Sequence, residues 1–266
     1  MSGWDGRAVR GAWNHVPDMH SFRHTRARRR WLTGAIVATV VVAGGLVLLN
    51  WTALGRAVGG PREPGNTLLV SSPEEVAVAR TQLDRLAVGA RPGPAGDYRR
   101  AAFGDAWTDT DGNGCNQRDD VLLRDLDKGR PYRVALQRSC DHDVLAGTWL
   151  DPYAGGTVTL TDAKDPKQAE RVQIDHIVPL SVAWRYGARD WTDSRRLAFA
   201  NDLRELVAVA GEANQAKGGA DASQWRPVAG AQCGYAVRYV TVKAVYDLPT
   251  DAREKRALAD MLASCG

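Results

Sequence analysis

The segment Val172-Gln173-Ile174-Asp175-His176-Ile177-Val178-Pro179-Leu180 organises the rest of this chain. Its apolar residues predict a buried β-strand, and Pro179, which has no backbone N–H, ends the pairing of that strand. Asp175 and His176 place a carboxylate beside an imidazole. Neighbouring strand residues point to opposite faces, so the strand must distort or turn near its end before both side chains reach one ligand. An isolated Asp-His pair is commonly a structural hydrogen bond, which is the alternative interpretation.

Two later elements extend this pattern, namely Asn201-Asp202 and Asn214-Gln215-Ala216-Lys217-Gly218. Hydrolysis of a phosphodiester requires a base that activates water and a cation that takes up negative charge. Mg²⁺ prefers oxygen ligands and keeps several waters, so the oxygens of Asp175 and Asn214 would be enough protein ligands. Near neutral pH the His176 imidazole would accept the proton of the water. The elements together therefore supply the groups that such a reaction needs.

These elements resemble the active site of the HNH, or ββα-metal, nucleases, in which a strand with an acid–His pair is followed by a second strand and a helix with a last Asn or His. From about Tyr98 to Cys265 the chain is similar to actinobacterial secreted HNH proteins related to the C-terminal domain of GmrSD-type restriction enzymes. The similar stretches are residues 103–107, 114–119, 149–153, 172–180, 183–184, 199–202 and 214–218. The resemblance implies a metal-dependent endonuclease that acts on DNA, with RNA as the alternative substrate. It also implies Mg²⁺ or Mn²⁺ on Asp175 and Asn214, with His176 as the general base.

One position departs from the HNH pattern. The middle Asn of that pattern falls at Glu205, and an ionised carboxylate accepts hydrogen bonds but donates none. Asn201 matches the Asn-Asp pair of the related proteins and would share the orienting role with Glu205. Arg118 and Lys217 are expected to contact the substrate phosphates. Because of Glu205, the alternative function is a membrane-tethered extracytoplasmic binding module that has lost most or all catalysis and binds calcium.

Residues 109–120 form a second candidate metal site. The oxygen-bearing residues Asp109, Asp111, Asn113 and Asp120 have EF-hand-like spacing, with Gly114 at the sharp turn. This spacing predicts Ca²⁺ binding, although Asp-Gly segments are also common as plain turns. Cys115 within the loop is unusual for a calcium site.

The four cysteines form an even set: Cys115, Cys140, Cys233 and Cys265. All four follow the apolar N-terminal segment, so an oxidising compartment would allow them to form disulfides. Three pairings are possible, and we favour Cys115–Cys140 with Cys233–Cys265, because each joins neighbours in sequence on one side of the central motif. Zinc is the alternative, but no Cys-x-x-Cys or His spacing supports it.

The net charge of +4 is concentrated at the N-terminus. Residues 1–55 contain seven arginines and two aspartates, a formal balance of +5, so the remaining residues carry about −1. The basic pI of about 9.0 therefore gives no reason to expect nucleic-acid binding by the globular part. Phosphate contacts would have to come from a local cluster, for which Arg195, Arg196, Arg204 and Lys217 are candidates. A solvated helix face is the alternative for the first two.

The N-terminal segment predicts a membrane anchor. An arginine cluster at residues 26–30 precedes an uncharged apolar run at residues 31–49, which is long enough to cross a bilayer. The cluster predicts a cytoplasmic N-terminus and an extracytoplasmic remainder. A buried soluble helix is the alternative to a membrane span. Secretion after cleavage is the alternative to an anchor, and translation from Met19 would leave a short basic region typical of an export signal.

We therefore expect five regions: a basic cytoplasmic tail (1–30), a transmembrane helix or uncleaved signal anchor (31–51), a linker (52–71), a helix and loop (72–97), and an HNH nuclease-like domain (98–266). The fold class is α+β, with a ββα core embedded in further helices and a small antiparallel sheet. Expected strands are residues 144–149, 157–160, 172–178 and 206–209. Expected helices are residues 72–88, 181–187, 193–200, 212–217, 231–246 and 251–262.

Overall fold

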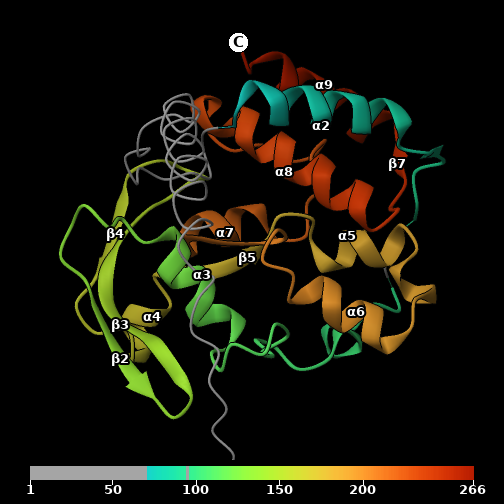
Figure 1. Ribbon diagram of the computed structural model, residues 1–266. Coiled ribbons are helices and arrows are strands. Elements are labelled where there is room, and N and C mark those ends of the chain that lie inside the picture. Colours follow the sequence, from blue (N-terminus) through green and yellow to red (C-terminus); the bar gives the residue numbers. More distant parts are fainter. Residues whose placement is uncertain (1–70, 94–95) are drawn as a thin grey trace, which may run out of the picture. The chain divides into compact units, whose positions relative to one another are not determined.

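A computed structural model describes residues 71–93 and 96–266 (Figure 1). The predicted basic tail, the apolar segment and nearly all of the linker lie outside these residues. In the part of the chain that is described, no helix is long and apolar enough to cross a membrane.

Three helices pack together at the top of Figure 1: α2 (Pro73–Arg85), α8 (Gln232–Val245) and α9 (Ala252–Ala263). The predicted start of α2 is confirmed, because Ser72 and Glu75 form a capping box in which each side chain bonds the other's backbone N–H. The helix ends before residue 88, since Leu86 turns to an extended conformation. Strand β1 (Val88–Gly89) then pairs in parallel with β7 (Thr250–Asp251).

The centre of the domain is an antiparallel strand pair covered by a short helix. Strand β5 (Val172–His176) pairs with β6 (Leu206–Ala210), and α7 (Gly211–Lys217) follows β6 directly and contacts both strands. The junction needs a glycine, because a Cβ on Gly211 would lie 2.2 Å from the carbonyl oxygen of Glu170. Strand β5 ends two residues earlier than predicted, where the Ile177 N–H bonds the carbonyl of Glu205.

A three-stranded antiparallel sheet lies on the left of Figure 1, in the order β2–β3–β4. Strands β3 (Cys140–Leu150) and β4 (Thr157–Leu160) contain the two predicted strands, but β2 (Arg133–Gln137) was not predicted. The reason is that β2 is almost fully exposed, so it lacks the alternation of buried and exposed positions that identifies a strand. Helix α3 (Gln117–Asp125) packs between β3 and the β5–β6 pair.

Between β5 and β6 the chain forms α5 (Leu180–Arg185), η2 (Ala188–Asp190) and α6 (Asp193–Ala200), close to the predicted helices. The remaining elements are η1 (Arg100–Phe103), α4 (Pro166–Ala169) and η3 (Ala229–Ala231). Two apolar clusters of buried residues result, one under the helices and one between α3, β3 and the central strands. The chain is thus of mixed α+β class with small sheets.

Both predicted disulfides are confirmed, Cys115–Cys140 and Cys233–Cys265. The first joins the loop before α3 to the start of β3, and the second joins α8 to the C-terminus. The described residues contain no free cysteine.

Candidate active site at the end of strand β5

Asp175 faces helix α7 and is held by two donors. Its Oδ2 atom accepts one hydrogen bond from Lys217 Nζ at 2.7 Å and another from the Tyr153 hydroxyl at 2.6 Å. Lys217 also donates to the His176 carbonyl oxygen at 2.7 Å, and its side chain is completely buried. The ammonium therefore lies beneath the Asp-His pair, rather than on the surface where a substrate phosphate would meet it.

A second pair of side chains joins the same two elements. Asn214 Nδ2 donates to Gln173 Oε1 at 2.8 Å, and Gln173 Nε2 in turn donates to the Glu170 carbonyl. Gln173 and Asp175 are two residues apart on β5, and Asn214 and Lys217 are three apart on α7. Gln173 and Asp175 therefore lie on one face of β5, and Asn214 and Lys217 lie on the face of α7 that packs against it. The bond from Nδ2 to Gln173 leaves the Asn214 amide oxygen as the atom that can bind a cation.

The His176 side chain has different surroundings from Asp175. Its Nε2 atom lies 2.9 Å from the carbonyl oxygen of Ala200. A carbonyl only accepts, so Nε2 carries the hydrogen and Nδ1 is the acceptor. Burial lowers the pKa of His176 to about 4, although the nearby Asp175 carboxylate opposes this shift. At neutral pH the ring is therefore uncharged and can accept a proton.

A small cavity borders His176 on the side of helix α6. The segment after η1 forms one wall of it, and Leu180, Ala200 and Asn201 form another. Asn201 is buried and contacts His176 only indirectly. Its Oδ1 accepts from the Thr108 N–H at 3.1 Å, and its Nδ2 donates to the Leu197 carbonyl at 3.0 Å. Asn201 therefore joins the end of α6, where the carbonyl partner of His176 lies, to the loop that lines the cavity.

Glu205 holds the backbone that follows His176. Its carboxyl oxygens lie 3.2 and 3.1 Å from the Val178 nitrogen, and the side chain is fully buried. Burial raises the pKa of Glu205 well above its usual value, and the Val178 N–H only partly opposes this effect. The protonated form, which this shift favours, has both a donor and an acceptor, as an Asn amide does. Burial therefore shifts Glu205 toward the form that has a donor, whereas its contacts with the Val178 N–H are both as an acceptor.

Arg118 lies away from this group of residues. It is on α3, where its guanidinium approaches the Val172 carbonyl at 3.5 Å, at the opposite end of β5 from His176. Burial lowers its pKa. The arginines Arg196 and Arg204 also have structural contacts: Arg196 bonds backbone carbonyls around α6, and Arg204 pairs with Asp202 at 2.6 Å.

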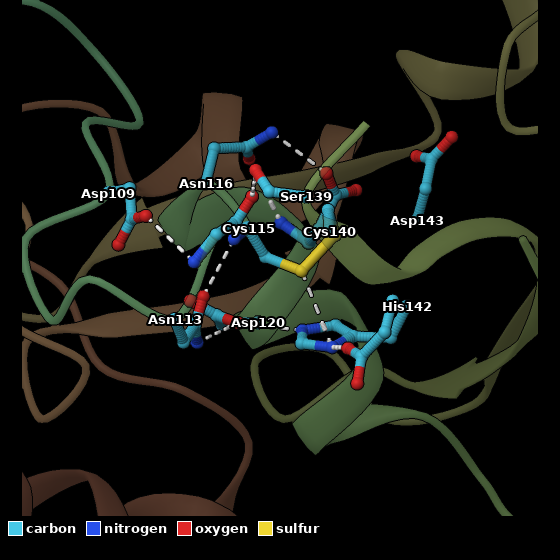
Figure 2. The surroundings of a disulfide bond; sticks show 12 residues. Asp109, Asn113, Cys115, Asn116, Asp120, Ser139, Cys140, His142 and Asp143 are labelled. Carbon is cyan, nitrogen blue, oxygen red and sulfur yellow. Dashed lines mark hydrogen bonds and ion pairs between the residues drawn. A yellow bond between two sulfur atoms is a disulfide. The ribbon is translucent and has the colours of Figure 1, made fainter. Parts of the chain in front are cut away.

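The loop proposed for calcium is closed by hydrogen bonds within itself (Figure 2). Asp109 accepts the backbone N–H groups of Gly112 and Gly114 at 2.7 and 2.9 Å, as in a turn. Asn113 donates to Asp120 Oδ1, which His142 Nε2 also approaches at 2.7 Å. Across the described ranges, the carboxylates of Asp109, Asp111 and Asp120 do not form a three-ligand group, and calcium binding by this loop stays a prediction.

The only three-residue group of potential metal ligands among the described residues is Cys115, Cys140 and His142. Its two sulfur atoms are bonded to each other, and His142 Nδ1 lies 3.4 Å from Cys115 Sγ (Figure 2). A disulfide sulfur is not a thiolate, so this group does not hold a metal in the oxidised protein.

Sequence reasoning gave no role to two residues that the structure places at the site. Tyr153 binds Asp175 from the β3–β4 connection, and Gln173 orients Asn214. Period-two alternation in β5 could have identified Gln173, since it shares a face with Asp175. Tyr153 ends the similar stretch at residues 149–153, but its partner could not be identified locally, because the contact joins segments 22 residues apart.

Comparison with known proteins shows which family the chain is similar to. Residues 116–261 match the family model described as "GmrSD restriction endonucleases, C-terminal domain". The chain is also 39% identical over 201 residues to a protein of Arthroderma benhamiae (strain ATCC MYA-4681 / CBS 112371) described as an "Uncharacterized secreted protein". That alignment covers 74% of this chain and 90% of the relative. No solved structure matches the chain. The actinobacterial origin of the resemblance stays a prediction. The family match spans more than half of the chain and includes Asp175, His176 and Asn214, so the protein belongs to the family of the GmrSD restriction endonuclease C-terminal domain.

Proposed function

We propose that this protein is a metal-dependent endonuclease of the HNH type that hydrolyses phosphodiester bonds in DNA, with RNA as the alternative substrate. One observation supports this most strongly. His176 is neutral, its Nε2 is bound to the Ala200 carbonyl, and it directly follows the carboxylate that faces the helix carrying Asn214. The family match supports the nuclease class.

His176 acts as the general base in this proposal. Its Nδ1 atom accepts the proton of the attacking water, and the Ala200 carbonyl, already bound to Nε2–H, then stabilises the imidazolium. Because this carbonyl also fixes the ring orientation, His176 needs no movement to present Nδ1. Asn201 and Glu205 hold the backbone on either side and serve as positioning residues.

The donor set fits a hard divalent cation, Mg²⁺ or Mn²⁺. Both bonds to Asp175 go to Oδ2, so Oδ1 would be its ligand atom, and the amide oxygen of Asn214 would be the second. Two protein oxygens suit an ion that keeps most of its waters. When bound, the metal would neutralise charge on the phosphate and the leaving oxygen. Because Lys217 already neutralises Asp175, we expect weak metal affinity.

The proposed location is extracytoplasmic. The two disulfides are typical of an oxidising compartment, and the Arthroderma benhamiae relative is described as secreted. We retain the single-pass anchor at residues 31–51 as part of the proposal, with secretion after cleavage as its alternative.

The test is plasmid cleavage by the full-length, disulfide-bonded protein with Mg²⁺, with Mn²⁺ and with EDTA. We expect metal-dependent nicking that His176→Ala abolishes. Asn214→Ala should require much more metal, whereas Asn214→Asp, which keeps an oxygen ligand, should cleave at metal concentrations close to those of the wild type. Asn214 is the better ligand to vary, because changing Asp175 would leave the Lys217 ammonium buried and unpaired.

Absence of cleavage by the folded protein under every metal condition would overturn the proposal and favour a catalytically inactive binding module. Unchanged cleavage by His176→Ala would remove His176 as the base. An unaltered metal titration for Asn214→Ala would remove Asn214 as a ligand.

A further inference from the structure

Strand β2 and the first half of β3 form a two-stranded antiparallel ribbon. β2 pairs with β3 from Gln137↔Cys140 to Arg133↔Ala146, whereas β4 pairs only with the other half of β3, from Gly147 to Leu150. The ribbon lies at the lower left of Figure 1. Two such strands have the width that the major groove of a DNA duplex accepts.

The outer strand of this ribbon and the segment leading to it are strongly basic. Residues 128–138 contain four cationic side chains and no carboxylate, although residues 56–266 together carry about −1. Every residue of this segment except Ala135 is exposed. Arg130 pairs with Asp127, and Arg133 bonds the Thr161 carbonyl. Within the described ranges, Lys128 and Arg138 form no salt bridge, so their charges are available to an anionic partner.

The same segment exposes apolar side chains between its cations. Tyr132, Val134 and Leu136 are 43%, 40% and 76% exposed. Interspersed cationic and apolar groups match a duplex, because the cations pair with its phosphates and the apolar groups contact its sugars and the methyl groups in the major groove.

A disulfide connects this ribbon to the loop that leads away from the candidate active site. Cys140, the first residue of β3, is joined to Cys115 in the loop before α3 (Figure 2). The same loop begins with the segment from Gly104 to Trp107, which lines the cavity beside His176. The disulfide therefore ties the turn of the ribbon to the far end of the loop whose first residues form a wall of the candidate active site.

We propose that the outer strand of the ribbon and the segment leading to it, residues 128–138, are a docking surface for duplex nucleic acid, which they bind through phosphate contacts of Lys128 and Arg138. This inference rests on the proposed nuclease function for its choice of partner. The ribbon binds the duplex backbone without reading its sequence and delivers it to the site at the end of β5.

The test compares two pairs of substitutions that remove equal charge. Lys128→Gln/Arg138→Asn alters the ribbon, and Asn is chosen because residue 138 has a positive φ of 56°, which Asn tolerates. Arg253→Gln/Arg256→Gln is the matched control, since it removes two exposed arginines from α9, which Figure 1 shows at the opposite end of the domain. The wild type and both variants carry the same N-terminal arginines, so the proposal is tested by the differences in DNA binding among these three proteins.

Binding of a short DNA duplex by the full-length protein is measured by fluorescence anisotropy in EDTA, over a series of salt concentrations. The logarithm of the binding constant falls as log salt rises, and each lost phosphate contact makes this fall less steep by about 0.9. We expect the salt dependence of the ribbon variant to be less steep than that of the wild type by about 1.8. We also expect this variant to bind roughly tenfold or more weakly at about 0.1 M salt. The control should match the wild type.

Equal losses in both variants would overturn the proposal, because only overall charge would then matter. An unchanged ribbon variant would also overturn it. The proposal would also be overturned if the ribbon variant kept DNA binding but lost binding to anionic vesicles, or kept DNA binding but lost self-association measured by sedimentation. Because binding is measured without metal, a protein that binds through the ribbon but never cleaves would contradict the proposed catalysis and leave the docking surface intact.

Discussion

Replacing Lys217 by Met should destabilise the domain severely. The Lys217 ammonium lies 2.7 Å from Asp175 Oδ2, and the two side chains are 0% and 11% exposed. Removing one partner of a buried ion pair leaves the other charge uncompensated, which costs about 3–5 kcal/mol. The His176 carbonyl also loses its donor, at a cost of about 1 kcal/mol. The Tyr153 hydroxyl still binds Asp175 and offsets part of this loss. We therefore expect the free energy of unfolding to fall by about 3–5 kcal/mol, a large share of the roughly 5–15 kcal/mol typical of a domain.

The measurement is urea unfolding at neutral pH, followed by tryptophan fluorescence with both disulfides intact. The control is Lys217→Met combined with Asp175→Asn, which removes both charges. It should recover most of the lost stability, because no buried charge remains. A single variant that loses less than about 1 kcal/mol would refute the reasoning, since exposed pairs contribute that little. A double variant as unstable as the single one would show that the loss comes from packing rather than from charge.

Three further predictions concern the base, its support and the disulfide. His176 must be neutral to act, so kcat/KM for cleavage should rise with pH around a midpoint near 4 and stay level to neutral pH; a midpoint near 6.5 would contradict the burial of the ring. Glu205→Gln should keep the bond from the Val178 N–H and most of the stability, whereas Glu205→Ala should lose about 1–3 kcal/mol in urea unfolding; equal stability of the two variants would contradict this role. Replacing Cys115 and Cys140 by Ser should lower the free energy of unfolding by about 3–4 kcal/mol, because the bond closes a loop with a sequence separation of 25; an unchanged melting temperature would count against it.

Local chemistry made several features of this protein predictable from its residues. The Ser72 cap, the apolar run of β5 and the helix carrying Asn214 each depend on neighbours within a few positions, so the pattern of the chain reports them directly. The order of the two central strands and their helix followed in the same way. The disulfide pairing was also correct, because each bond joins cysteines on one side of the central motif.

Other features depend on contacts between segments far apart in the chain. Lys217 has the sequence context of a surface cation at a helix end, and only the packing of α7 on β5 buries it against Asp175, 42 residues away. Arg118 was expected at the substrate but lies at the far end of β5, because α3 crosses the strands there. Strand β2 carries no local signal, since its partner supplies the hydrogen bonds and its own side chains stay exposed.

The Glu205 carboxyl gives the clearest physical reason for this division. Residue type alone indicates an ionised acceptor, whereas complete burial favours a protonated group that resembles an amide in its hydrogen bonding. Residue type and spacing therefore identify which groups are present and along which element they lie. Solvent exclusion by distant segments determines their charge, their partners and the atoms left available for chemistry.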